Sequence, residues 1–207
     1  MKKVLIFILF IIQINIMAQT PVQGEYYFNR HEMVAGFNFS SDGRFQFFYS
    51  YGAIDRSASG TYRLDGNTIK LNSDKAAGQD FTITQQLKKG KGYTLEFEHP
   101  NKYLLENIRC IFFVDGRQQD EYSDSKGIMN ADIDHCDSIY VQHSLYPDIA
   151  TKVKDKGNTN NRFTLNLNQS LEQVSFKGID LTIVNENMLT CLPNYFMKTE
   201  DIEFVKQ

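Results

Sequence analysis

The sequence has 207 residues, of which 42% are hydrophobic and 13% aromatic, so it holds enough apolar side chains for one large or two small cores. Lys and Arg number 22 against 25 Asp and Glu, which gives a formal net charge of −3 at pH 7. Nucleic-acid phosphates require clustered Lys and Arg, so this acidic chain is not expected to bind nucleic acid.

Residues 1–18 have the pattern of a secretory signal peptide. Lys2 and Lys3 precede an unbroken apolar run over residues 4–12, which is too short to span a bilayer comfortably. We expect cleavage after Ala18, so that the mature chain begins at Gln19 or just after. No cysteine follows the run where a lipid anchor would need one, which favours an exported protein, periplasmic or secreted, without membrane insertion after signal removal. A single amino-terminal anchor is the alternative.

The first half predicts a series of consecutive antiparallel strands, because apolar residues alternate with polar ones and Gly, Asp and Asn interrupt the alternation. After an opening strand over residues 24–28, the Asp42-Gly43 turn joins one hairpin and the Asp65-Gly66-Asn67 turn joins a second. A third hairpin pairs residues 79–87 with residues 92–99. Seven or eight such strands are enough to curl into a closed or nearly closed barrel.

The strand after the Asp42-Gly43 turn is unusually aromatic. Phe45, Phe47, Tyr49 and Tyr51 share one face, and Phe48 points to the other. An eight-stranded barrel either packs its interior solid or holds one small ligand, so these four rings predict either a core or a cavity for a small apolar ligand. The two tyrosines are compatible with a cavity, because a buried phenol needs a hydrogen-bond partner.

Arg56 follows in a segment of small residues and is the other candidate ligand-binding residue. Its guanidinium is suited to hold a ligand carboxylate at the barrel mouth. The alternative is a structural ion pair with Asp55 or another acid.

After residues 99–107 the texture changes, and we place the domain boundary there, with a barrel domain over residues 19–104 and a second domain over residues 105–207. The second half shows about seven short strands with loops of unequal length, which is typical of a small β-sandwich. The predicted fold class is therefore all-β, an amino-terminal antiparallel barrel followed by a sandwich.

Three cysteines lie in the second half, so at least one stays unpaired within the chain. Cys110 sits on an apolar strand face and is expected to be a buried thiol. If a disulfide forms, Cys136 with Cys191 is the expected pair. The cysteine spacings match no zinc pattern, and we expect neither a metal site nor a cofactor.

The first half resembles the lipocalin-like domains of exported bacterial proteins over residues 24–99. The resemblance is carried by Gly24-Glu25-Tyr26, Asp42-Gly43-x-Phe45, Gly60-Thr61-Tyr62 and Gly66-Asn67-x-Ile69-x-Leu71. Tyr26 stands where such domains usually have tryptophan. The resemblance implies a lipocalin-like β-barrel.

The second half more faintly resembles the carboxypeptidase regulatory-like sandwich domain. Val114-Asp115-Gly116 and Ser123-Asp124-x-x-Gly127 carry this resemblance. It implies a support or interaction module, since such domains usually hold no catalytic residue.

Catalysis finds little support in the sequence. His135 and Cys136 are adjacent, but neighbours on a strand point to opposite faces, so the imidazole is not placed to activate the thiol. We therefore expect an exported, non-catalytic binding protein that holds a small apolar ligand in the barrel. The alternative is an assembly protein with a solid barrel that docks a protein partner through a sheet edge.

Overall fold

The computed structural model describes residues 22–207, so the expected signal peptide and its cleavage site lie outside the described residues. Within this part the chain forms sixteen strands and two short 3-10 helices, η1 (Lys102–Leu104) and η2 (Gln169–Glu172). The predicted all-β class, with a closed antiparallel barrel and further sheets, is confirmed. Over residues 22–207 neither helix has the length and apolar character needed to cross a membrane.

Eight strands close the barrel, and every neighbouring pair is antiparallel. In chain order they are β1 (Gly24–Arg30), β2 (Met33–Phe39), β3 (Arg44–Tyr51), β4 (Ile54–Asp65), β5 (Thr68–Ser73), β14 (Asp180–Asn185), β15 (Met188–Cys191) and β16 (Ile202–Lys206). Each strand pairs with the next barrel strand along the chain, and β16 returns to pair with β1. This is an up-and-down barrel without a free edge.

The expected turns join these strands. Gly43 and Gly66 have φ values of 79° and 59°, a left-handed conformation that favours glycine. They lie in the turns of the β2–β3 and β4–β5 hairpins, at the positions where the sequence predicts these turns. The register of β3 then sends alternate side chains inward, and the pattern of buried and exposed residues along the strand repeats every two residues.

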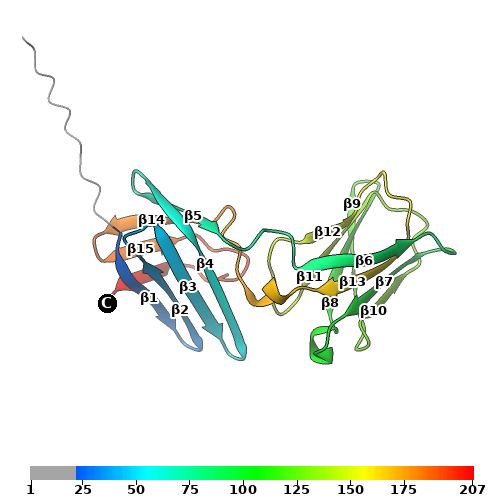
Figure 1. Ribbon diagram of the computed structural model, residues 1–207, viewed down its shortest axis with the longest axis horizontal. Helices are drawn as coiled ribbons and strands as arrows, with labels where there is room; N and C mark the ends of the chain where they lie inside the picture. Colours follow the sequence, from blue (N-terminus) through cyan, green and yellow to red (C-terminus); the bar gives the residue numbers. More distant parts are fainter. Residues whose placement is uncertain (1–21) are drawn as a thin grey trace, which may run out of the picture.

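The chain between β5 and β14, residues 74–179, forms two four-stranded sheets (Figure 1). One has the order β10 (Ile128–Ala131), β7 (Tyr93–Glu98), β13 (Arg162–Leu167), β6 (Phe81–Leu87), and the other β12 (Thr151–Lys154), β11 (Ser138–His143), β8 (Ile108–Val114), β9 (Arg117–Tyr122). Apolar side chains of both sheets share one core, in which the rings of Tyr93 and Phe112 meet edge to face at 5.8 Å. The two sheets therefore pack as a sandwich.

This strand order differs from the expected division near residue 104. The expected third hairpin does not form, because β13 lies between β6 and β7 and pairs antiparallel with β6 and parallel with β7. Both strands belong to the sandwich, and β14, β15 and β16 return to complete the barrel. The sandwich is thus inserted between two barrel strands, and the break at residues 99–107 lies inside it. Turn residues and alternation predict strands and reversals of the chain, but not which strands become neighbours. The long-range pairs β5–β14 and β1–β16 decide that here.

The Cys136–Cys191 pair, named as the expected one if a disulfide forms, is not bonded, and all three cysteines are free. Cys136 is buried in the sandwich core, whereas Cys191 belongs to β15 of the barrel. The two residues therefore lie in different hydrophobic cores.

Candidate binding surface on the barrel

The structure places the four predicted aromatic residues of β3 in two different environments. Phe45, Phe47 and Tyr49 point inward and are buried in the barrel core. Tyr51 lies at the end of the strand and is 45% exposed. The Tyr49 hydroxyl donates to the backbone oxygen of Phe196 at 3.2 Å, and burial raises the pKa of Tyr49. The partner that a buried phenol needs is thus supplied by the chain itself.

Aromatic rings from outside the strands fill the barrel interior. Phe176 enters from the segment that returns from η2 to β14, and Phe196 from the connection between β15 and β16. The ring of Phe176 lies 4.9 Å from that of Phe47, 5.6 Å from that of Phe45 and 5.9 Å from that of Phe196. These separations are those of directly packed aromatic pairs, so the barrel interior around Phe176 is a solid core.

Arg56 is buried and points away from solvent. It donates from Nη1 to the backbone oxygen of Pro147 at 2.5 Å and from Nη2 to that of Gln173 at 2.8 Å. Its Nη2 also lies 3.8 Å from the carboxylate of Asp148, whereas the adjacent Asp55 is exposed. Burial lowers the pKa of Arg56, and the nearby carboxylate of Asp148 opposes this shift.

Three further buried charges surround Arg56 where barrel and sandwich meet. Lys75 Nζ lies 2.6 Å from Asp80 Oδ1 and 2.8 Å from Asp148 Oδ2, and it donates to the Gln173 oxygen at 2.7 Å. Burial raises the pKa of Asp80 to about 6, although Lys75 opposes the shift. Two cations and two carboxylates thus balance each other across the junction. Nη1 and Nη2 of Arg56 are engaged by backbone oxygens and Asp148, whereas its buried Nε has no hydrogen-bond partner among the described residues. These contacts correspond to the structural alternative for Arg56.

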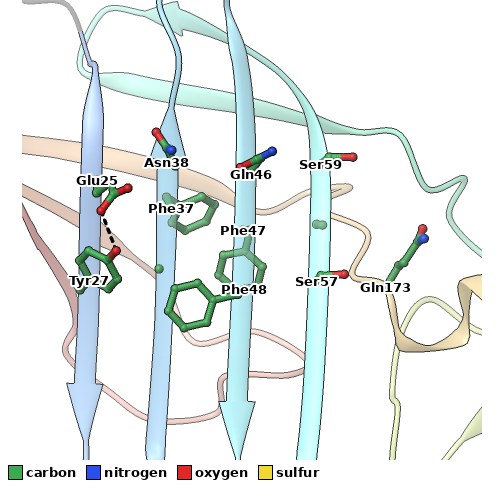
Figure 2. Close-up of a pocket in the computed structure, with 12 residues that line it drawn as sticks. Glu25, Tyr27, Phe37, Asn38, Gln46, Phe47, Phe48, Ser57, Ser59 and Gln173 are labelled. Atoms are coloured by element: carbon green, nitrogen blue, oxygen red, sulfur yellow. Dashed lines mark hydrogen bonds between the residues drawn. The ribbon is translucent and has the colours of Figure 1, made fainter.

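A recess of about 450 Å³ lies on the outer face of the barrel, over β1–β4 (Figure 2). Strand pairing arranges its lining in two parallel rows that cross the strands. The polar row consists of Glu25, Asn38, Gln46 and Ser59, which are paired in register from β1 to β4. The aromatic row consists of Tyr27, Gly36, Phe48 and Ser57, paired in the same way, and Gln173 continues it through a bridge to Ser57.

The missing side chain at Gly36 makes room for the two rings of the aromatic row. Phe48 is 40% exposed, and its ring centroid lies 6.0 Å from that of Tyr27. A Cβ at Gly36 would stand 2.5 Å from Phe48 Cε1 and 3.1 Å from Tyr27 Cδ1. Any larger residue at position 36 would therefore push the rings of Phe48 and Tyr27 out of the recess.

The recess is nearly neutral. Glu25 is the single charged residue among the twelve that line it. The hydroxyl of Tyr27 donates to Glu25 Oε2 at 2.7 Å, and this contact with the carboxylate raises the pKa of Tyr27. The remaining polar side chains are amides and hydroxyls, which both donate and accept hydrogen bonds. A second, more open recess of about 1010 Å³ adjoins the first, shares Glu25 and Tyr27 with it, and extends over β16.

The His135–Cys136 pair shows no catalytic geometry. His135 is exposed and its Nε2 lies 3.3 Å from Asp115 Oδ1. Cys136 is buried, and burial raises the pKa of its thiol, which disfavours the thiolate that a nucleophile requires. Among residues 22–207 no group of three or more His, Cys, Asp and Glu side chains is arranged to hold a metal ion.

Sequence reasoning missed the outer recess. Alternation already put Phe48 on the face opposite to the core, but an outward polar face looks the same whether it meets solvent or a ligand. The sequence feature that could have indicated the recess was Phe48, an outward aromatic residue on β3, directly opposite Gly36 on β2.

The chain matches no protein-family model, and no curated protein or solved structure matches it significantly. The fold and the site therefore define its class on their own. It is an all-β protein whose closed antiparallel barrel carries an exposed, mixed polar and aromatic recess.

Proposed function

We propose that this chain is an exported, non-catalytic binding protein with a lipocalin-like barrel, and that it recognises its ligand on the outer face of β1–β4. Export to the periplasm or the medium rests on the leader pattern of residues 1–18. The observation that carries the proposal is the contact between the exposed ring of Phe48 and the half-buried ring of Tyr27, set over Gly36 beside a row of hydrogen-bonding side chains. Aromatic faces beside a few convergent polar groups are typical of ligand sites.

The location outside the barrel follows from how the interior is filled. A small apolar ligand inside the barrel would have to displace Phe176 or Phe196, whose rings already contact those of β3. Displacing a buried ring costs about 2 kcal/mol in burial alone. The geometry therefore favours the outer recess over an interior site built from Phe45, Phe47, Tyr49, Tyr51 and Arg56, which was one of the two alternatives for these residues.

Docking of a protein partner through a sheet edge is less well supported. The free edge strand β9 pairs with β8 over six residues without a register shift, but it carries Arg117, Asp120 and Glu121. Charges on an edge strand hinder the addition of another strand. The edge strands β10 and β12 are only four residues long. The remaining edge strand, β6, has seven residues, but its pairing with β13 contains a register shift, and such irregularities also hinder strand addition.

Binding of fractionated host material to the immobilised protein tests this proposal. Lipid, polysaccharide and protein fractions of the host's growth medium and periplasm are passed over the wild type, Phe48→Ala and Tyr103→Ala. Tyr103 is an exposed aromatic residue in η1, so its replacement is a matched control. We expect at least one fraction to bind, with the signal reduced by Phe48→Ala and retained by Tyr103→Ala.

Two results would contradict the proposal. One is the absence of binding from every fraction. The other is a lipid-fraction signal that Phe48→Ala leaves unchanged, which would return the site to the barrel interior.

A further inference from the structure

The two rows on the outer barrel face have a length, a direction and a chemistry that specify a ligand class. We infer that the recess binds a linear, neutral oligosaccharide that lies across β1–β4, perpendicular to the strands. This inference rests on the proposed function and names its ligand.

The direction follows from strand pairing. Glu25 pairs with Asn38, Asn38 with Gln46, and Gln46 with Ser59, so the polar row runs straight across four strands. Neighbouring strands lie about 4.8 Å apart, so the row is about 14 Å long, the reach of roughly three linked sugar rings. Gln173 lengthens the neighbouring aromatic row at its β4 end, and the adjoining recess lengthens the surface beyond β1.

The chemistry of the rows matches a sugar chain. Sugar hydroxyls donate and accept hydrogen bonds, as do the amides of Asn38 and Gln46, while a carboxylate such as that of Glu25 accepts them. The Ser59 hydroxyl donates to Asp74 Oδ2 at 2.7 Å and offers its oxygen as an acceptor. The C–H faces of a pyranose ring are apolar and pack on aromatic rings, which Tyr27 and Phe48 present in the parallel row. A chain that lies along both rows would contact both kinds of group on β1 and on β3, where Tyr27 and Phe48 carry the rings.

The charges argue against other ligand classes. No Lys, Arg or His lines the first recess, so it has no group to pair with a phosphate, sulfate or carboxylate. In the adjoining recess the one cation, Arg30, is outnumbered by carboxylates, which include Asp201 and Glu203. Arg44 lies nearby on β3, but it is paired with Asp74 at 2.8 Å. Glu25 further disfavours an anionic ligand. A purely apolar ligand would leave the hydrogen-bonding groups of the polar row without partners.

Isothermal titration with defined oligosaccharides tests the inference on the full mature chain. The probes are neutral trimers and hexamers of glucose, mannose, xylose and N-acetylglucosamine, each in α- or β-linked form as available, with oligogalacturonate as an anionic comparison. We expect a neutral probe to bind, the hexamer at least as tightly as the trimer, and oligogalacturonate to show no binding.

Four variants locate the site. Phe48→Ala is expected to weaken binding at least about tenfold, because it removes a ring face from the ligand. Gln46→Ala is expected to weaken it about three- to tenfold. Gly36→Ala adds no new polar group but displaces the Phe48 ring, and it should also weaken binding. Gln119→Ala, an exposed glutamine on β9, is the matched control and should retain wild-type affinity.

The outcomes separate this inference from the proposed function. If no neutral probe binds while a lipid or protein fraction binds in a Phe48-dependent manner, the saccharide class is overturned and the outer recess stands. If a neutral probe binds and neither Phe48→Ala nor Gln46→Ala weakens it, this site is overturned. If neither probes nor fractions bind, both proposals fail.

Discussion

Replacing Phe176 by alanine removes the ring that joins the aromatic residues of the barrel interior. Phe176 is 2% exposed, and its ring contacts those of Phe37, Phe45, Phe47 and Phe196 at 4.9–5.9 Å. Core Phe→Ala replacements cost about 3–5 kcal/mol, from lost burial plus the cavity left behind. With four rings around the side chain we expect a loss near the middle of this range, about 4 kcal/mol.

Chemical denaturation measures this loss, and Phe48→Ala on the outer face is the matched control. Because Phe48 is 40% exposed, its replacement should cost less than about 1 kcal/mol. The cavity in Phe176→Ala should also bind a small aromatic probe such as benzene or indole, which the wild type should not bind. A loss under about 1 kcal/mol for Phe176→Ala, or saturable binding of the probe inside the wild-type barrel, would refute a packed interior.

Three further predictions concern stability. The pKa of Asp80 is raised from 3.8 to about 6 in the folded chain, so the folded state holds the proton more tightly. The free energy of unfolding of the wild type should therefore fall by about 3 kcal/mol relative to Asp80→Asn as the pH rises from about 4 to above 6, and parallel pH profiles would contradict this. Arg56→Met leaves the buried carboxylate of Asp148 partly unpaired and should lower the free energy of unfolding, measured in urea, by about 3–5 kcal/mol. Arg63 is an exposed arginine on the same strand, and Arg63→Met should cost under about 0.5 kcal/mol. Equal losses would argue against the buried network. Gly60→Ala places its Cβ 2.1 Å from the backbone oxygen of Asn72 and should lower the free energy of unfolding by more than about 2 kcal/mol. Gly36→Ala meets only the ring edges of Phe48 and Tyr27, which can move, and should cost less than about 1 kcal/mol. A higher melting temperature for Gly60→Ala than for Gly36→Ala would contradict this packing.

Local patterns in the sequence predicted local structure well. The Asp42-Gly43 turn and the inward rings of Phe45 and Phe47 appear in the structure as the alternation indicates. Tyr51 shares their parity but is exposed, because it lies at the last position of β3. A strand pattern specifies which face a side chain shares, but the end of the strand decides whether that face is still covered.

Long-range contacts could not be predicted from the same patterns. The insertion of the sandwich depends on the β5–β14 and β1–β16 pairs, which no turn residue encodes. Arg56 was a candidate ligand-binding residue, but its partner Asp148 lies in the β11–β12 connection, far along the chain. The outer recess likewise exists only once four strands are in register.

Phe47 and Phe48 provide the most direct test of where this protein binds its ligand. They are adjacent on β3, and one ring is buried in the barrel core while the other lines the outer recess. The protein is labelled with ¹³C in the phenylalanine rings and titrated with the oligosaccharide or host fraction that binds, and NMR spectra then follow the signals of Phe47 and Phe48 separately. We predict that the Phe48 signals shift and the Phe47 signals stay nearly unchanged. Larger shifts at Phe47 than at Phe48 would place the ligand inside the barrel and contradict the account.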